Sequence, residues 1–93
     1  MLRQYGWMAR KIVIVSGRVQ GVGFRWATLE EAERLGLSGS VRNENDGTVR
    51  VEIEGDDLAS MLAWLGRGPR YAEVTALDVT DAPETGIAGF RVG

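Results

Sequence analysis

Hydrophobic and polar positions along the chain recur with two different periods, and each period predicts a different secondary-structure element. The run Lys11–Ser16 is apolar on both faces and rich in β-branched residues, which is typical of a central, well-covered strand. Apolar positions then recur at helical spacing over Phe24–Leu35, so this segment is predicted to be a helix that ends at Gly36. The apolar stripe of this helix comprises Phe24, Ala27, Thr28, Ala32 and Leu35. Trp26 and Leu29 fall off the stripe, and we expect them to be partly exposed or to line a site.

The middle of the chain carries the clearest strand pattern. Over Thr48–Glu54, apolar residues alternate with charged ones, which predicts a strand with one buried face. The segment Ser38–Asn43 is predicted to be its partner strand. Between the two strands, Asp46 and Gly47 form a strong turn signal. These observations predict a β-hairpin whose first strand ends at Asn43.

The last third of the chain predicts one more helix and two more strands. Asp56 or Asp57 is expected to cap the helix, whose stripe comprises Leu58, Met61, Leu62 and Leu65. Glycines and a proline over residues 66–69 end the helix. We expect strands at Ala72–Thr80 and Ala88–Val92, with Phe90 and Val92 on one face of the latter.

The predicted order of elements is strand, helix, strand, strand, helix, strand and a short terminal strand. Two helices with one apolar stripe each are best buried side by side on one face of an antiparallel sheet. The predicted fold is therefore α+β, in the split βαβ or ferredoxin-like arrangement.

The length of 93 residues allows one domain, which we predict to span residues 1–93. Residues 1–9 are predicted to be an extension that is not ordered, and Met8 is an alternative start. The apolar stretches are far shorter than the roughly 18 residues that a transmembrane helix needs. Arg10 and Lys11 interrupt the N-terminal apolar residues, so a signal peptide is not predicted. We therefore expect a cytoplasmic protein that does not bind membranes.

Composition restricts the chemistry that the chain can perform. A net charge of −2 argues against a general nucleic-acid binder, because such proteins usually carry a basic excess. The chain has no cysteine and no histidine, so disulfides, thiol nucleophiles and the commonest metal ligands are excluded. Glu30, Glu31 and Glu33 follow closely on one predicted helix, so a solvated helix face is a better interpretation than a metal site.

The stretch GRVQGVGFR, residues 17–25, joins the first predicted strand to the first predicted helix. Gly21 and Gly23 lack a Cβ, so the backbone can adopt positive φ and present successive N–H groups on one side. The helix start adds unpaired N–H donors and the positive end of the helix dipole. Arg25, in the first turn, adds a planar cationic group suited to phosphate oxygens. The stretch thus predicts a phosphate-binding site, although a glycine turn that only makes a tight connection would look similar.

The same stretch resembles the signature loop of the acylphosphatase family, residue for residue. The block Gly39–Asn43 with the following Asp46–Val49 resembles that family's second strand and hairpin, and residues 89–92 resemble its closing strand. The likeness covers about residues 11–92. It implies a ferredoxin-like fold and the hydrolysis of small-molecule acyl phosphates by a monomer without a metal or other cofactor. It departs from the family's pattern at Ser40, where a bulky aromatic is usual, and at Ala27 and Thr28.

The resemblance also implies which residues act. Arg25, which ends the loop, and Asn43, which ends the second strand, match the family's catalytic pair. The phosphoryl group would be held by the loop residues Gln20, Gly21, Val22, Gly23, Phe24 and Arg25. Asn43 would position a water molecule through its amide group. We also expect the carboxylate of Gly93 to be the partner of Arg25 when the site is empty.

Other interpretations remain open. Arg25 could be a surface helix residue, Asn43 a turn residue that bonds its own backbone, and Arg18 a solvated loop residue. The domain could bind a phosphate or an acyl phosphate without cleaving it, as a regulator or as a piece of a carbamoyl-transfer protein. It could also bind nucleic acid on the sheet face, although an obvious aromatic pair is lacking there.

Overall fold

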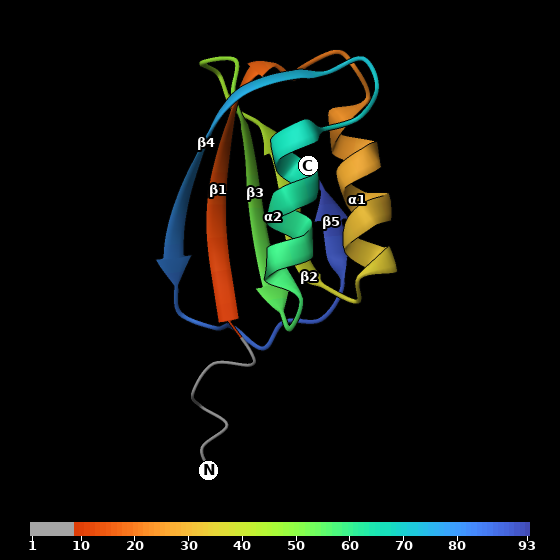
Figure 1. Cartoon of the computed structure of the whole chain (residues 1–93). Helices are drawn as coiled ribbons and strands as arrows, with labels where there is room; N and C mark the ends of the chain where they lie inside the picture. Colours follow the sequence, from red (N-terminus) through yellow and green to blue (C-terminus); the bar gives the residue numbers. More distant parts are fainter. Residues whose placement is uncertain (1–8) are drawn as a thin grey trace.

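The computed structural model describes residues 9–93, and the elements follow the predicted order (Figure 1). The elements are β1 (Ala9–Arg18), α1 (Phe24–Arg34), β2 (Ser38–Asn43), β3 (Val49–Gly55), α2 (Leu58–Arg67), β4 (Glu73–Ala82) and β5 (Phe90–Val92). The extension predicted at residues 1–9 lies outside the described residues apart from Ala9, which begins β1 and pairs with Gly55.

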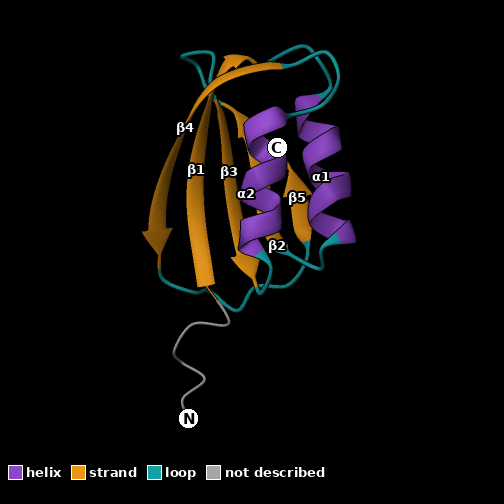
Figure 2. Cartoon of the chain, in the orientation of Figure 1, coloured by secondary structure: helices purple, strands orange, loops and turns teal. Residues whose placement is uncertain are grey.

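The strands form one sheet in the order β4-β1-β3-β2-β5, and both helices lie on the same face of it (Figure 2). The split βαβ prediction is confirmed for the four longer strands, which pair antiparallel. The terminal strand differs, because β5 pairs parallel with β2 and makes the sheet mixed. The cause is the path of residues 83–89, which cross from the end of β4 to the end of the sheet where β2 begins. A strand that starts there must run in the same direction as β2.

The core fills the space between the helices and the sheet. The helices contribute Phe24, Thr28 and Ala32 from α1 and Leu58, Met61 and Leu65 from α2. The strands contribute Val13, Val15, Val41, Val49, Val51 and Ile53, each with no exposed surface. The prediction that β1 is covered on both faces is wrong in part. Its residues Ile12 and Ile14 are only half-buried, because both helices of residues 9–93 pack on the other face of the sheet.

Both helices have ends that their local sequence explains. At the end of α1, Gly36 has a φ of 71°, Leu37 N–H donates to the Ala32 carbonyl at 2.8 Å, and Gly36 N–H donates to the Glu33 carbonyl at 3.1 Å. This is a Schellman motif, with the buried Leu37 as its apolar contact. At the start of α2, Asp57 is the cap, and its carboxylate accepts a hydrogen bond from Ser60 N–H at 3.1 Å.

Candidate functional site

The loop between β1 and α1 has the backbone geometry of an anion-binding site. Gly21 and Gly23 have φ angles of 75° and 79°, and Gly23 is the N-cap residue of α1. An added Cβ at either glycine would meet nothing within 4 Å, so the glycines are required by backbone conformation and the space in front of them is open.

The first turn of α1 offers unpaired donors. The first backbone hydrogen bond of the helix runs from Ala27 N–H to the Gly23 carbonyl at 3.1 Å. Within residues 9–93, no side chain caps this helix start and its first turn holds no acidic residue. The N–H groups of Phe24, Arg25 and Trp26 therefore point out of the helix without an intrahelical partner. Such a terminus, with the positive end of the helix dipole, attracts an anion.

Arg25 is half-buried and is held by the end of the chain. Its Nη1 donates a hydrogen bond to the backbone oxygen of Gly93 at 2.5 Å, so the predicted contact between these residues is present. Gly93 N–H donates in turn to the carbonyl of Val41 in β2 at 2.8 Å. One donor of the guanidinium is used in this way. The others are free to bind a further anion, since Arg25 makes no ion pair with a carboxylate side chain in the described part of the chain.

Asn43 ends β2 at the same end of the sheet where α1 begins (Figure 1). It lies two residues after the fully buried Val41, so both project from the helix-covered face of the strand. Arg25 and Asn43 are therefore brought to one end and one face of the sheet, linked through Gly93 and Val41.

The loop and the β2–β3 turn are joined by the side chain of Gln20. Its Nε2 donates to the carbonyls of Glu44 and Thr48 at 2.8 and 2.9 Å. These carbonyls flank the turn that follows Asn43, so Gln20 fixes the loop relative to that residue. The sequence placed Gln20 among the phosphate-binding residues, and in the structure its side chain is a brace. Only its backbone N–H is available to a substrate.

In the turn after Asn43, the side chain that bonds the backbone is that of Asp46. The carboxylate of Asp46 accepts hydrogen bonds from the hydroxyl of Thr48 at 2.6 Å and its N–H at 3.0 Å, and these bonds lower the pKa of Asp46. Asp46 thus performs the turn role that an asparagine often has. Asn43 is exposed, and its amide makes no hydrogen bond to any residue from 9 to 93.

The side chains of two other predicted loop residues, Val22 and Phe24, pack in or against the core. Phe24 has 1% of its surface exposed, and its ring packs on Trp64 with centroids 5.9 Å apart. Val22 packs against the core from its edge. The sequence also missed the role of Thr28, whose buried hydroxyl donates to the Phe24 carbonyl at 2.7 Å and so needs no other partner. The departure from the family at Thr28 is therefore accommodated within the helix.

Residues 9–93 were also compared with the requirements of a metal site and of a membrane-spanning helix. No group of three or more acidic or histidine side chains is placed to hold a metal ion. Neither helix is both long and apolar enough to cross a bilayer.

Comparison with known structures shows that the fold is shared with acylphosphatases. The fold is shared with an acylphosphatase structure from Coxiella burnetii, at a TM-score of 0.88 and 33% identity, over 92% of this chain and 93% of that one. A second acylphosphatase structure, from Bacillus subtilis, has a TM-score of 0.86 and 34% identity, over 91% of this chain and 98% of that one.

Sequence comparison identifies the family directly. The acylphosphatase family profile matches residues 11–92. An acylphosphatase of Pseudomonas aeruginosa is 62% identical over 80 residues, which are 84% of this chain and 88% of that protein. The chain therefore belongs to the acylphosphatase family.

Proposed function

We propose that this protein hydrolyses acyl phosphates to a carboxylate and phosphate, with Arg25 and Asn43 as its catalytic pair. Membership of the acylphosphatase family supports the reaction. The observation that supports the site is the meeting of three features at one end of the sheet: unpaired N–H groups, the Arg25 guanidinium and the free amide of Asn43.

The loop would hold the phosphoryl group. Backbone N–H groups over Gln20–Arg25 would donate to its oxygens, and Arg25 would grip two of them through donors that Gly93 leaves free. These donors are fixed before the substrate arrives, so they stabilise the charge on the equatorial oxygens throughout the reaction. Because phosphoryl transfer needs little covalent help, positioning and charge stabilisation carry most of the catalysis.

Asn43 would place the attacking water in line with the leaving group. Its amide oxygen can accept a hydrogen bond from the water while its NH₂ donates to a phosphoryl oxygen. The water oxygen forms a bond to phosphorus, and the bond from phosphorus to the acyl oxygen breaks. The acyl group leaves as a carboxylate, and both protons of the water end on the phosphate. An amide is a weak base, which suffices because the leaving carboxylate needs no proton.

The direct test is hydrolysis of benzoyl phosphate by the purified protein in the presence of EDTA. We expect turnover, and a loss of about 10²-fold or more in the Arg25→Ala and Asn43→Ala variants. Near-normal turnover by both variants would refute the assignment of the site.

We further propose that the protein acts as a cytoplasmic monomer without a nucleic-acid or membrane partner. The net charge of −2 supports the absence of nucleic-acid binding. Size-exclusion chromatography with light scattering should give a mass near 10.2 kDa, and added RNA should leave the elution unchanged.

A further inference from the structure

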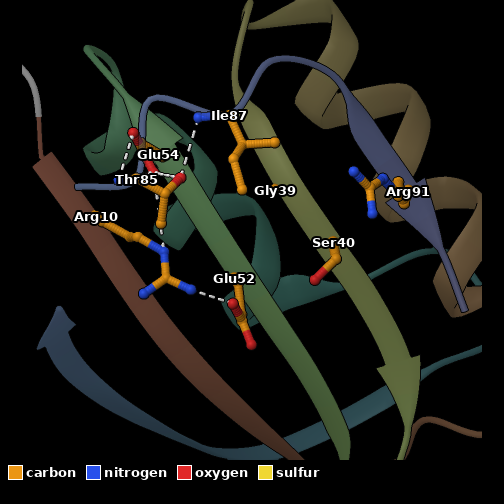
Figure 3. A pocket seen from close by; sticks show the side chains of 8 residues that line it. All are labelled: Arg10, Gly39, Ser40, Glu52, Glu54, Thr85, Ile87 and Arg91. Carbon is orange, nitrogen blue, oxygen red and sulfur yellow. Dashed lines mark hydrogen bonds and ion pairs between the residues drawn. The ribbon is translucent and has the colours of Figure 1, made fainter. Parts of the chain in front are cut away.

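The uncovered face of the sheet has a hollow at the end opposite to the phosphate loop (Figure 3). Its volume is about 190 Å³, and its wall includes Arg10, Glu52 and Glu54 from the sheet and Thr85 from the β4–β5 connection. The register places it at the start of β1 and the end of β3, since Arg10 lies opposite Glu54. Asn43 lies opposite Val49, at the other end of β3.

Among the side chains that line this hollow, Glu54 accepts the most hydrogen bonds. It is 7% exposed, and its carboxylate accepts four hydrogen bonds. Three come from Thr85, through its N–H at 3.0 and 3.1 Å and its hydroxyl at 2.8 Å, and one comes from Gly86 N–H at 2.7 Å. Arg10 Nε lies 3.8 Å from the same carboxylate. Burial alone would raise the pKa of Glu54, but these bonds and Arg10 outweigh it and keep the group ionised.

The segment that Glu54 holds leads directly to the proposed active site. From Gly86 the chain runs through β5 to Gly93, at most about 25 Å of extended backbone. Gly39 N–H donates to the Gly89 carbonyl at 2.9 Å, and β5 then pairs with β2. The segment ends where Gly93 accepts the hydrogen bond from Arg25.

The strand β5 packs Phe90 and Val92 against the core but has few backbone pairings to hold its register. It comprises only Phe90–Val92, it lies at the edge of the sheet, and its pairing with β2 is parallel. Short edge strands in a parallel pair are weakly held, and register is set by whatever fixes their ends. Here the anchor at the start is Glu54, and the anchor at the end is the Gly93 contact with Val41 and Arg25.

We propose that Glu54 is a positioning residue for Arg25, acting through the β4–β5 connection and the register of β5. This rests on the proposed role of Arg25. The carboxylate clamp on Thr85 and Gly86 sets where Gly93 lies, and Gly93 orients the guanidinium before a phosphoryl group binds. Loss of the clamp leaves Arg25 with more conformations, which weakens phosphate binding and slows turnover.

The test is a double-mutant cycle between Glu54→Gln and Arg25→Ala, measured in two ways. One is kcat/KM for benzoyl phosphate, and the other is the affinity for inorganic phosphate by calorimetry. Glu54→Gln should reduce each about fivefold in the wild-type background and have almost no effect in the Arg25→Ala background. Thr85→Val, which removes one of the four bonds, should give a smaller loss of the same kind. Glu84→Gln, on the exposed part of the same connection, is the matched control and should have no effect.

Equal losses in both backgrounds would show that Glu54 acts only through general stability, and would overturn the proposal. A gain in activity or phosphate affinity would also overturn it, because the clamp would then be holding Arg25 away from the substrate. If the wild type does not hydrolyse benzoyl phosphate, the proposed function fails, and the phosphate cycle still decides the role of Glu54. If hydrolysis depends on Arg25 but the cycle is additive, only the positioning role fails.

Discussion

Arg25 and Gly93, separated by 68 positions in the sequence, are joined by a hydrogen bond of 2.5 Å from Nη1 to the backbone oxygen. The bond brings the last strand of the sheet to the first turn of α1. It also holds the Arg25 guanidinium beside the loop of residues 20–25, whose backbone N–H groups donate to no residue from 9 to 93. The site that we propose for the phosphoryl group therefore combines residues that are far apart in the sequence.

Replacement of Arg25 should separate the effect of its positive charge from the effect of its planar pair of donors. Arg25→Ala is expected to lower kcat/KM for benzoyl phosphate by about 10²-fold or more. Arg25→Lys keeps the charge but loses the planar pair of donors, so it should recover only part of the loss. Full activity in the lysine variant would contradict a two-donor grip on the phosphoryl group. Arg18→Lys, at the end of β1 just before the loop, is the control and should behave as wild type.

Replacement of Asn43 should affect turnover and spare binding. Because we assign Asn43 to the water molecule, Asn43→Ala should lower kcat by about 10²-fold. The inhibition constant of inorganic phosphate should stay within about twofold of the wild-type value, since the loop and Arg25 remain. Steady-state kinetics with phosphate as inhibitor measures both quantities. A loss of phosphate affinity as large as the loss in kcat would show that Asn43 binds the phosphoryl group itself.

The left-handed backbone at Gly23 should matter for phosphate binding as well as for stability. Gly23→Ala and Gly36→Ala replace glycines with φ angles of 79° and 71°, and neither new Cβ meets an atom within 4 Å. Each should cost about 1–2 kcal/mol of unfolding free energy from backbone strain. Only Gly23→Ala should weaken phosphate binding, because Gly36 lies at the far end of α1. Denaturant unfolding and phosphate titration of both variants check this, and equal phosphate affinities would contradict it.

The lowered pKa of Glu54 predicts how stability depends on pH. Burial raises this pKa, but the bonds from Thr85 and Gly86 and the charge of Arg10 bring it below the ordinary value of 4.5. A lowered pKa in the folded state means that the unfolded chain binds the proton first as pH falls. The stabilisation by Glu54 is therefore complete above about pH 4.5 and is lost as pH falls through the folded-state pKa.

Urea unfolding from about pH 6 to about pH 3 measures this dependence. Glu54→Gln should reduce the unfolding free energy at neutral pH by about 2 kcal/mol, and it should flatten the decline toward acid. Glu84→Gln should retain the wild-type slope. A slope unchanged by Glu54→Gln would contradict the ionised clamp.

The parts of the fold that depend on local sequence could be predicted. The alternation of Val49, Val51 and Ile53 gave a strand with a buried face, and Gly36 with Leu37 gave the end of α1. The direction of β5 could not be predicted, because it depends on how residues 83–89 cross the end of the sheet.

The candidate site also has parts that the local sequence predicts and parts that depend on the folded chain. The glycines and Arg25 carry their chemistry in the local sequence. The brace from Gln20 to the carbonyls of Glu44 and Thr48 depends on two segments that meet only in the folded chain. In the sequence, Glu54 is one of the alternating polar residues of its strand. Its hydrogen bonds from Thr85 and Gly86 form only in the folded chain, so they could not be predicted.

The central claim is that one phosphoryl group sits between the loop of residues 20–25, Arg25 and Asn43. Titration of isotopically labelled protein with inorganic phosphate, followed by NMR, tests it most directly. We expect saturable shifts of the backbone N–H signals of residues 20–25 and of the Asn43 side-chain amide, which reach saturation only at a higher phosphate concentration in Arg25→Ala. Shifts confined to Arg10, Arg91 and their neighbours on the uncovered face of the sheet would contradict the account.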